Sequence, residues 1–157
     1  MFDFDGVIVD TLGISPSPKR TLTVPESIQQ LVKKLVSNFH LAIISSSQTS
    51  TIKDIIAREG VADCFSDVLG YDVDSSKVVR IKMMLDQYGA KPNETVFITD
   101  TSGDIYDAHE SGVPAIAVTW GMQSRDTLAD AKPLTIVDSV AILEQEILGF
   151  FSGTIGE

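Results

Sequence analysis

The chain has 157 residues, of which 43% are hydrophobic and 22% charged, as expected for one globular domain. Its formal net charge of −10 disfavours nucleic acid as a partner or substrate, because phosphate backbones are held by clustered Lys and Arg. The single cysteine excludes an internal disulfide, no apolar run approaches the roughly 18 residues that span a membrane, and no basic leader opens the chain, so we expect a cytoplasmic protein.

The chain opens on two carboxylates, Asp3 and Asp5, which are followed by Gly6. Residues at i and i+2 of an extended segment point the same way, so both carboxylates can reach one reacting group. Asp3 can attack a phosphorus atom, while Asp5 can protonate the leaving oxygen and later deprotonate the attacking water. A hard cation such as Mg²⁺ is then needed to offset the repulsion between a carboxylate and a phosphate dianion. The alternative interpretation is that the two aspartates only cap a turn.

Only Met1 and Phe2 precede Asp3, so the first strand is either unusually short or begins upstream of this sequence. We interpret the next segment, residues 12–24, as a short flap. Its basic pair, Lys19-Arg20, is either solvated or close to the substrate. Residues 25–37 start with a proline and carry apolar side chains at helical spacing, which predicts a helix packed on a sheet.

A second apolar run, residues 41–44, is typical of a buried parallel strand. It ends in three consecutive serines, of which Ser45 is the candidate ligand of a phosphate oxygen. Ser46 and Ser47 have an equally good interpretation as helix caps. A helix is predicted over residues 51–59, and a short strand over 68–71.

Lys77 opens the next predicted helix, which has apolar residues at helical spacing as far as Tyr88. A lysine at a helix N-terminus opposes the helix dipole, so an anion nearby should compensate it. A bound phosphate, or the carboxylates of Asp3 and Asp100, would do so. A solvated surface lysine is the alternative.

A further buried strand, residues 96–99, delivers Asp100 and Asp104, two carboxylates four residues apart around a Gly turn. This arrangement is a sensible cation-binding loop. Asp104 is also a candidate cap for a helix predicted over residues 105–111.

Apolar strands alternate with helices along the whole chain, which predicts an α/β fold: a Rossmann-like, doubly wound parallel sheet with helices on both faces. We expect a single core domain over residues 1–157. Active sites of such sheets lie beyond the carboxyl ends of the strands, where Asp3, Ser45 and Asp100 would meet. A last helix over residues 140–151 ends in an apolar Phe-Phe pair, for which packing on the core and an oligomer contact are both open.

These motifs, in this order, resemble the haloacid dehalogenase superfamily, and within it the phosphoglycolate phosphatase-like branch. The opening DFDGVIVDT is similar to the nucleophile motif, Ser45 to the phosphate-binding Ser/Thr, Lys77 to the family lysine, and TDTSGD to the acidic metal motif. The resemblance implies a Mg²⁺-dependent phosphomonoester hydrolase with Asp3 as nucleophile and Asp5 as acid and base. Asp3, the Asp5 carbonyl and Asp100 would bind the metal, and Asp104 would bind it or orient its ligands.

Two departures from the branch leave alternatives open. Thr99 stands where the branch usually has Gly, and residues 12–40 are too few for the usual helical cap domain. In this superfamily a capless core implies a large phosphorylated substrate, or a neighbouring subunit in a homo-oligomer that acts as the lid. A catalytically silent binding or regulatory module is the main alternative. A phosphomutase usually needs a cap, and dehalogenases lack the second aspartate, so both rank lower.

Overall fold

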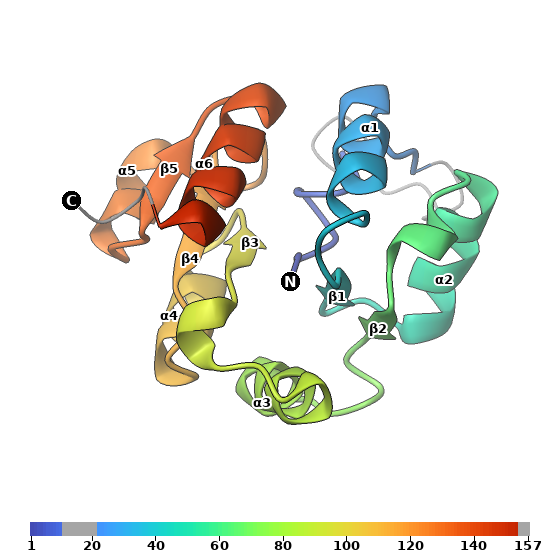
Figure 1. The fold of residues 1–157 in the computed structure, drawn as a ribbon, viewed down its shortest axis with the longest axis horizontal. Helices are drawn as coiled ribbons and strands as arrows, with labels where there is room; N and C mark the ends of the chain where they lie inside the picture. Colours follow the sequence, from blue (N-terminus) through green and yellow to red (C-terminus); the bar gives the residue numbers. More distant parts are fainter. Residues whose placement is uncertain (11–21, 154–157) are drawn as a thin grey trace.

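The computed structural model describes residues 1–10 and 22–153, in which strands and helices alternate along the chain (Figure 1). The strands are β1 (Ala42–Ile44), β2 (Asp67–Leu69), β3 (Phe97–Thr99), β4 (Ala115–Val118) and β5 (Thr135–Val137). The α-helices are α1 (Glu26–Leu35), α2 (Thr49–Arg58), α3 (Lys77–Tyr88), α4 (Ser102–Glu110), α5 (Arg125–Asp130) and α6 (Val140–Ser152), and the 3₁₀ turns are η2 (Ala62–Cys64) and η3 (Pro92–Glu94). Most of the predicted flap, including Lys19-Arg20, lies outside the described residues.

All strand pairs are parallel, and the first residues of the chain join two groups of strands. β1 pairs with β2, and β3, β4 and β5 pair in that order. Phe2 lies between the groups and forms parallel bridges to Ile43 of β1 and Ile98 of β3. Figure 1 shows the N-terminus between the two halves of the molecule. The parallel α/β fold predicted from the sequence is confirmed, with the central position of the sheet held by a single bridging residue.

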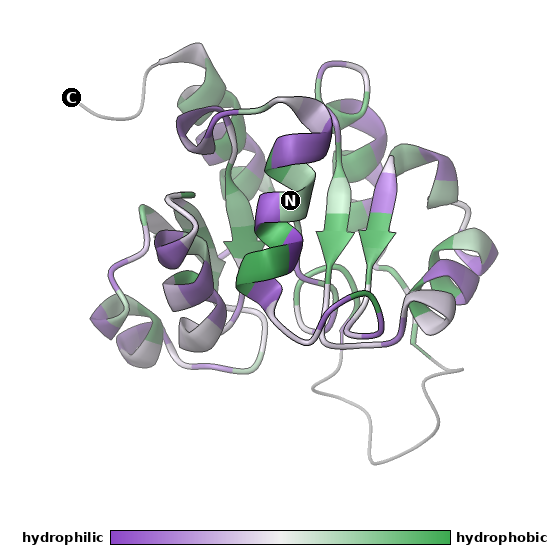
Figure 2. Cartoon of the chain, turned by 90° about the horizontal axis from the view of Figure 1, so that it is seen from below, coloured by the Kyte–Doolittle hydropathy of each residue, from purple (hydrophilic) through white to green (hydrophobic). Residues whose placement is uncertain are grey.

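Successive strand residues point to opposite faces of the sheet, and each face has its own apolar cluster. Ile43 and Ile98 pack with buried residues of α1, α2 and α6. Ile44 and Phe97, their chain neighbours, pack with buried residues of α3, α4 and α5. Figure 2 shows mostly hydrophobic strands between helices that carry both hydrophilic and hydrophobic residues. Burial on both faces explains why the strands read as continuous apolar runs.

Several element boundaries differ from the sequence predictions. The helix predicted over 105–111 begins at Ser102, because the Thr101 side chain caps it by accepting a hydrogen bond from the Asp104 amide. Asp104 is therefore a residue of the first turn and does not cap the helix. The strand predicted over 68–71 is Asp67–Leu69, and the helix predicted over 51–59 begins at Thr49.

The apolar C-terminal end packs partly on the chain itself. The ring of Phe151 lies 4.6 Å, centroid to centroid, from that of Phe39, although Phe151 remains 39% exposed. Cys64 is buried and free. Within the described residues, no helix is long and apolar enough to cross a membrane.

Candidate active site

The opening motif lies where the chain leaves the centre of the sheet. The Asp3 amide donates to the Ile98 carbonyl at 2.8 Å, which fixes Asp3 beside the end of β3. The chain then turns sharply, since the amides of Ile8 and Val9 both donate to the Phe4 carbonyl and Gly6 has a φ of +80°. Only 6% of Asp3 is exposed. Burial raises the pKa of Asp3 well above its usual value, and the charge of Lys77 opposes this effect.

Lys77, the first residue of α3, is buried between two carboxylates. Its Nζ lies 3.3 Å from Asp3 Oδ1 and 2.7 Å from Asp104 Oδ1, with the Phe97 ring 5.7 Å away. Burial alone would lower the pKa of Lys77, but the charges of Asp3 and Asp104 outweigh it and raise this pKa. Lys77 is therefore a fixed ammonium group, and the alternative of a solvated lysine is wrong.

Asp104 is occupied by protein partners at both oxygens. Oδ1 pairs with Lys77, and Oδ2 accepts a hydrogen bond of 2.8 Å from the Thr99 hydroxyl. The Thr99 hydroxyl also accepts from the Thr101 amide. The threonine that departs from the phosphatase pattern thus ties the carboxyl end of β3 to the first turn of α4.

Asp100 contrasts with Asp104, because one of its oxygens is left free. Oδ2 accepts from the Met122 amide at 2.7 Å, whereas Oδ1 is buried without a hydrogen-bond partner. Burial raises the pKa of this carboxyl. Gly6 and Gly121 both lie so close that a Cβ on either would come within 2.2 Å of the Asp100 side chain. An unsatisfied carboxylate oxygen is costly in a protein interior but suits a hard cation.

Two carboxylates of this site could bind Mg²⁺, and they do not form part of a dense acidic cluster. Among the described residues, no group of three or more His, Cys, Asp or Glu side chains is placed to hold a metal ion. Asp3 and Asp100 are the side chains that could bind it, and backbone oxygens and water would complete the shell, as Mg²⁺ commonly accepts. Of the two roles expected of Asp104, its contacts support the orienting one.

The serines after β1 form the other side of the site. Ser45 is fully buried, and its hydroxyl accepts from the Ser47 amide at 3.1 Å. The Ser47 hydroxyl donates to Asp5 Oδ2 at 2.5 Å. Ser47 does not cap α2, whose N-cap residue is Gln48. The sequence did not distinguish Ser47 as a partner of Asp5, since only the fold brings residues 42 positions apart into contact.

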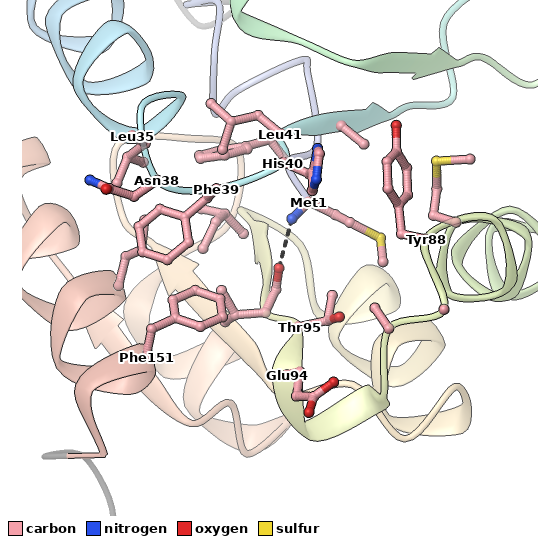
Figure 3. A pocket seen from close by; sticks show the side chains of 18 residues that line it. Met1, Leu35, Asn38, Phe39, His40, Leu41, Tyr88, Glu94, Thr95 and Phe151 are labelled. Atoms are coloured by element: carbon pink, nitrogen blue, oxygen red, sulfur yellow. Dashed lines mark hydrogen bonds between the residues drawn. The ribbon is translucent and has the colours of Figure 1, made fainter.

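A well-formed cavity lies elsewhere, at the amino ends of the strands. It has a volume of about 350 Å³ and is lined by apolar and aromatic side chains near Met1, among them Phe39, Leu41, Tyr88 and Phe151 (Figure 3). None of the candidate catalytic residues lines it. The candidate chemistry therefore lies at the carboxyl edge of the sheet, where parallel α/β folds place their active sites.

Comparison with known proteins identifies the family. The model of the haloacid dehalogenase-like hydrolases matches residues 15–118, about two thirds of the chain, so the chain belongs to this family. The matched segment contains Ser45, Lys77, Asp100 and Asp104, and it starts after Asp3 and Asp5.

Curated relatives include phosphatases. The chain is 26% identical over 129 residues to a phosphoglycolate phosphatase of Vibrio vulnificus, covering 80% of this chain and 55% of that protein. It is 30% identical over 121 residues to the probable phosphatase IndB of Dickeya dadantii, covering 75% of this chain and 53% of that protein. The chain thus spans about half the length of these relatives.

Solved structures support the fold over nearly the full length. A haloacid dehalogenase-like hydrolase from Streptococcus pneumoniae has a TM-score of 0.78 at 22% identity, covering 96% of both chains. An uncharacterized protein from Listeria monocytogenes has a TM-score of 0.76 at 17% identity, covering 96% of this chain and 97% of its own. The single-domain α/β architecture is therefore shared with proteins of matching length.

Proposed function

We propose that the chain is a Mg²⁺-dependent phosphomonoester hydrolase that works through an aspartyl-phosphate on Asp3. The observation that carries this proposal is the pairing of a buried nucleophile candidate with a buried cation: Asp3 Oδ1 lies 3.3 Å from Lys77 Nζ. The kinship with phosphatases supports the same chemistry. A silent module has less support, because keeping two buried carboxylates with raised pKa values is costly unless a ligand uses them.

In the first half-reaction, an oxygen of Asp3 attacks phosphorus and the bond from phosphorus to the ester oxygen breaks. Asp5 supplies the proton that the leaving oxygen needs, and the hydrogen bond from Ser47 holds its carboxyl in place. In the second half-reaction, Asp5 takes a proton from water as the water oxygen attacks phosphorus. Phosphate then leaves, and Asp3 is regenerated as a carboxylate.

The transferring phosphoryl group needs donors and positive charge. Ser45 and Lys77 are the residues proposed to hold its oxygens, and Asp104 keeps the Lys77 ammonium directed at Asp3. Asp3, Asp100 and the Asp5 carbonyl would hold Mg²⁺, which neutralises charge on the phosphate and so permits attack by an anion.

The substrate is proposed to be large. Residues 12–40, between the opening motif and β1, are too few to form a cap domain in addition to α1. A phosphorylated macromolecule, such as a phosphoprotein, suits an open site. The net charge of −10 disfavours a polynucleotide.

The test is phosphate release from small aryl phosphates and from phosphopeptides, with and without Mg²⁺, by the wild type, Asp3→Asn and Asp86→Asn. Asp86 is an exposed residue of α3 and serves as a matched control for the loss of one carboxylate. We expect metal-dependent turnover in the wild type and in Asp86→Asn, and none in Asp3→Asn. Turnover that survives Asp3→Asn, or its absence from every substrate while the folded protein binds Mg²⁺, would contradict the proposal.

A further inference from the structure

Arg80 is a charged residue in the interior that the proposed reaction does not use. Only 1% of it is exposed, and it is among the largest fully buried side chains of the protein. It lies three residues after Lys77 in α3, on the same side of the helix. Among the described residues, no carboxylate lies within ion-pair distance of its guanidinium, although the ion pairs of Lys77 are close by.

The guanidinium of Arg80 donates to backbone carbonyls instead. One terminal nitrogen donates to the carbonyl of Ser45 and, at 3.1 Å, to that of Leu69. Nε donates to the Ser76 carbonyl at 3.4 Å. These carbonyls belong to the residue after β1, the last residue of β2 and the N-cap of α3. One side chain therefore fastens together three segments that converge on the site.

Packing alone does not explain a buried arginine, because removing its charge from water is costly before its hydrogen bonds offset it. Burial lowers the pKa of Arg80, and the more distant charges of Asp104 and Asp3 act in the opposite direction. An apolar residue of similar size would fill the space without this cost. The guanidinium lies directly behind the Ser45 backbone, where its charge can act on a ligand held by Ser45.

We infer that Arg80 is a positioning residue for phosphoryl binding. By holding the Ser45 carbonyl, it fixes the loop that presents the Ser45 hydroxyl to the phosphate, in register with Lys77 one turn away. Its charge also adds a fixed positive potential behind that loop, which strengthens binding of a dianion in a site of low dielectric. This inference rests on the proposed function.

The test measures the affinity for inorganic phosphate by calorimetry at saturating Mg²⁺, together with the affinity for Mg²⁺ and the unfolding temperature. The variants are Arg80→Met, Arg80→Lys and Lys82→Met, the last removing an exposed positive charge from the same helix. We expect Arg80→Met to weaken phosphate binding tenfold or more at an unchanged affinity for Mg²⁺. Arg80→Lys should lose less, because it keeps the charge without the fork of donors. Lys82→Met should match the wild type.

A merely structural arginine would lower the unfolding temperature and leave the folded protein with normal phosphate affinity, and this result would overturn the inference. If Arg80→Met does not fold, Arg80→Lys decides: phosphate binding weakened threefold or more supports the inference, and wild-type binding overturns it. Normal phosphate binding in both variants refutes only the role inferred for Arg80 and leaves the proposed function standing. A wild type that neither binds phosphate nor hydrolyses any ester refutes the proposed function as well.

Discussion

Lys77 Nζ lies 2.7 Å from Asp104 Oδ1, closer than the 3.3 Å to Asp3. The two residues occupy the first turns of α3 and α4, so the ion pair joins the N-termini of two helices that flank the site. A buried lysine with one carboxylate on each side has little freedom to move. Asp104 thus determines where the positive charge beside the nucleophile is held.

This contact separates two roles for Asp104. We expect Asp104→Asn to lower kcat/KM by about 10- to 100-fold, because the neutral amide holds the ammonium less firmly, as for other charge-assisted contacts. Its affinity for Mg²⁺, measured by calorimetry, should stay within a few-fold of the wild type. A loss of Mg²⁺ binding as large as that of Asp100→Asn would show instead that Asp104 is a metal ligand.

Asp100→Asn should stabilise the metal-free protein while removing its response to Mg²⁺. The wild type buries a carboxylate oxygen without a partner, and a neutral amide at this position costs less to bury than the charged group. The unfolding temperature measured in EDTA should therefore rise in the variant. Added Mg²⁺ should raise the unfolding temperature of the wild type and not that of Asp100→Asn. Equal stabilisation of both by Mg²⁺ would place the metal elsewhere.

The wild type and Asp100→Asn should also differ in how their free energy of unfolding depends on pH. Burial raises the folded-state pKa of Asp100 above its ordinary value of 3.8, so the folded protein keeps this proton at a pH where the unfolded chain has lost it. Without metal, the contribution of Asp100 to stability is greatest below the unfolded value and falls as pH rises toward the folded one. The advantage of Asp100→Asn in the free energy of unfolding, from urea titrations in EDTA, should therefore be small near pH 3.5 and grow toward neutrality. An advantage that is constant or shrinks over this range would contradict the assignment.

The sequence predicted the strands that carry the site, because runs such as 41–44 are apolar at every position and end abruptly in polar residues. It also predicted Lys77 at the start of a helix, where Ser76 caps it. It did not predict Arg80, since an arginine in an amphipathic helix is expected on the solvated face. Only the packing of α3 against β1 shows that this position is buried.

The contacts made by side chains far apart in sequence were beyond prediction for a related reason. Thr99 was recognised as a departure from the phosphatase pattern, but its hydrogen bond to Asp104 depends on the exact start of α4. The helix was predicted to begin three residues later, with Asp104 outside its first turn. Misplacing one cap thus altered the interpretation of the carboxylate next to it.

Gly121 allows a test of how tightly Asp100 is held. A Cβ at this position would lie 2.2 Å from the Asp100 Cβ and 2.3 Å from Oδ2, so Gly121→Ala must displace the carboxylate or the loop after β4. We expect the variant to bind Mg²⁺ at least tenfold more weakly and to lose most of its turnover while remaining folded. The matched control is Gly103→Ala in the exposed first turn of α4, where an added Cβ meets nothing within 4 Å. Since alanine favours helix over glycine by up to about 1 kcal/mol, the control should lose neither stability nor Mg²⁺ affinity. Normal Mg²⁺ binding by Gly121→Ala would mean that the position of Asp100 does not matter for the metal, and would remove the main structural support for its role.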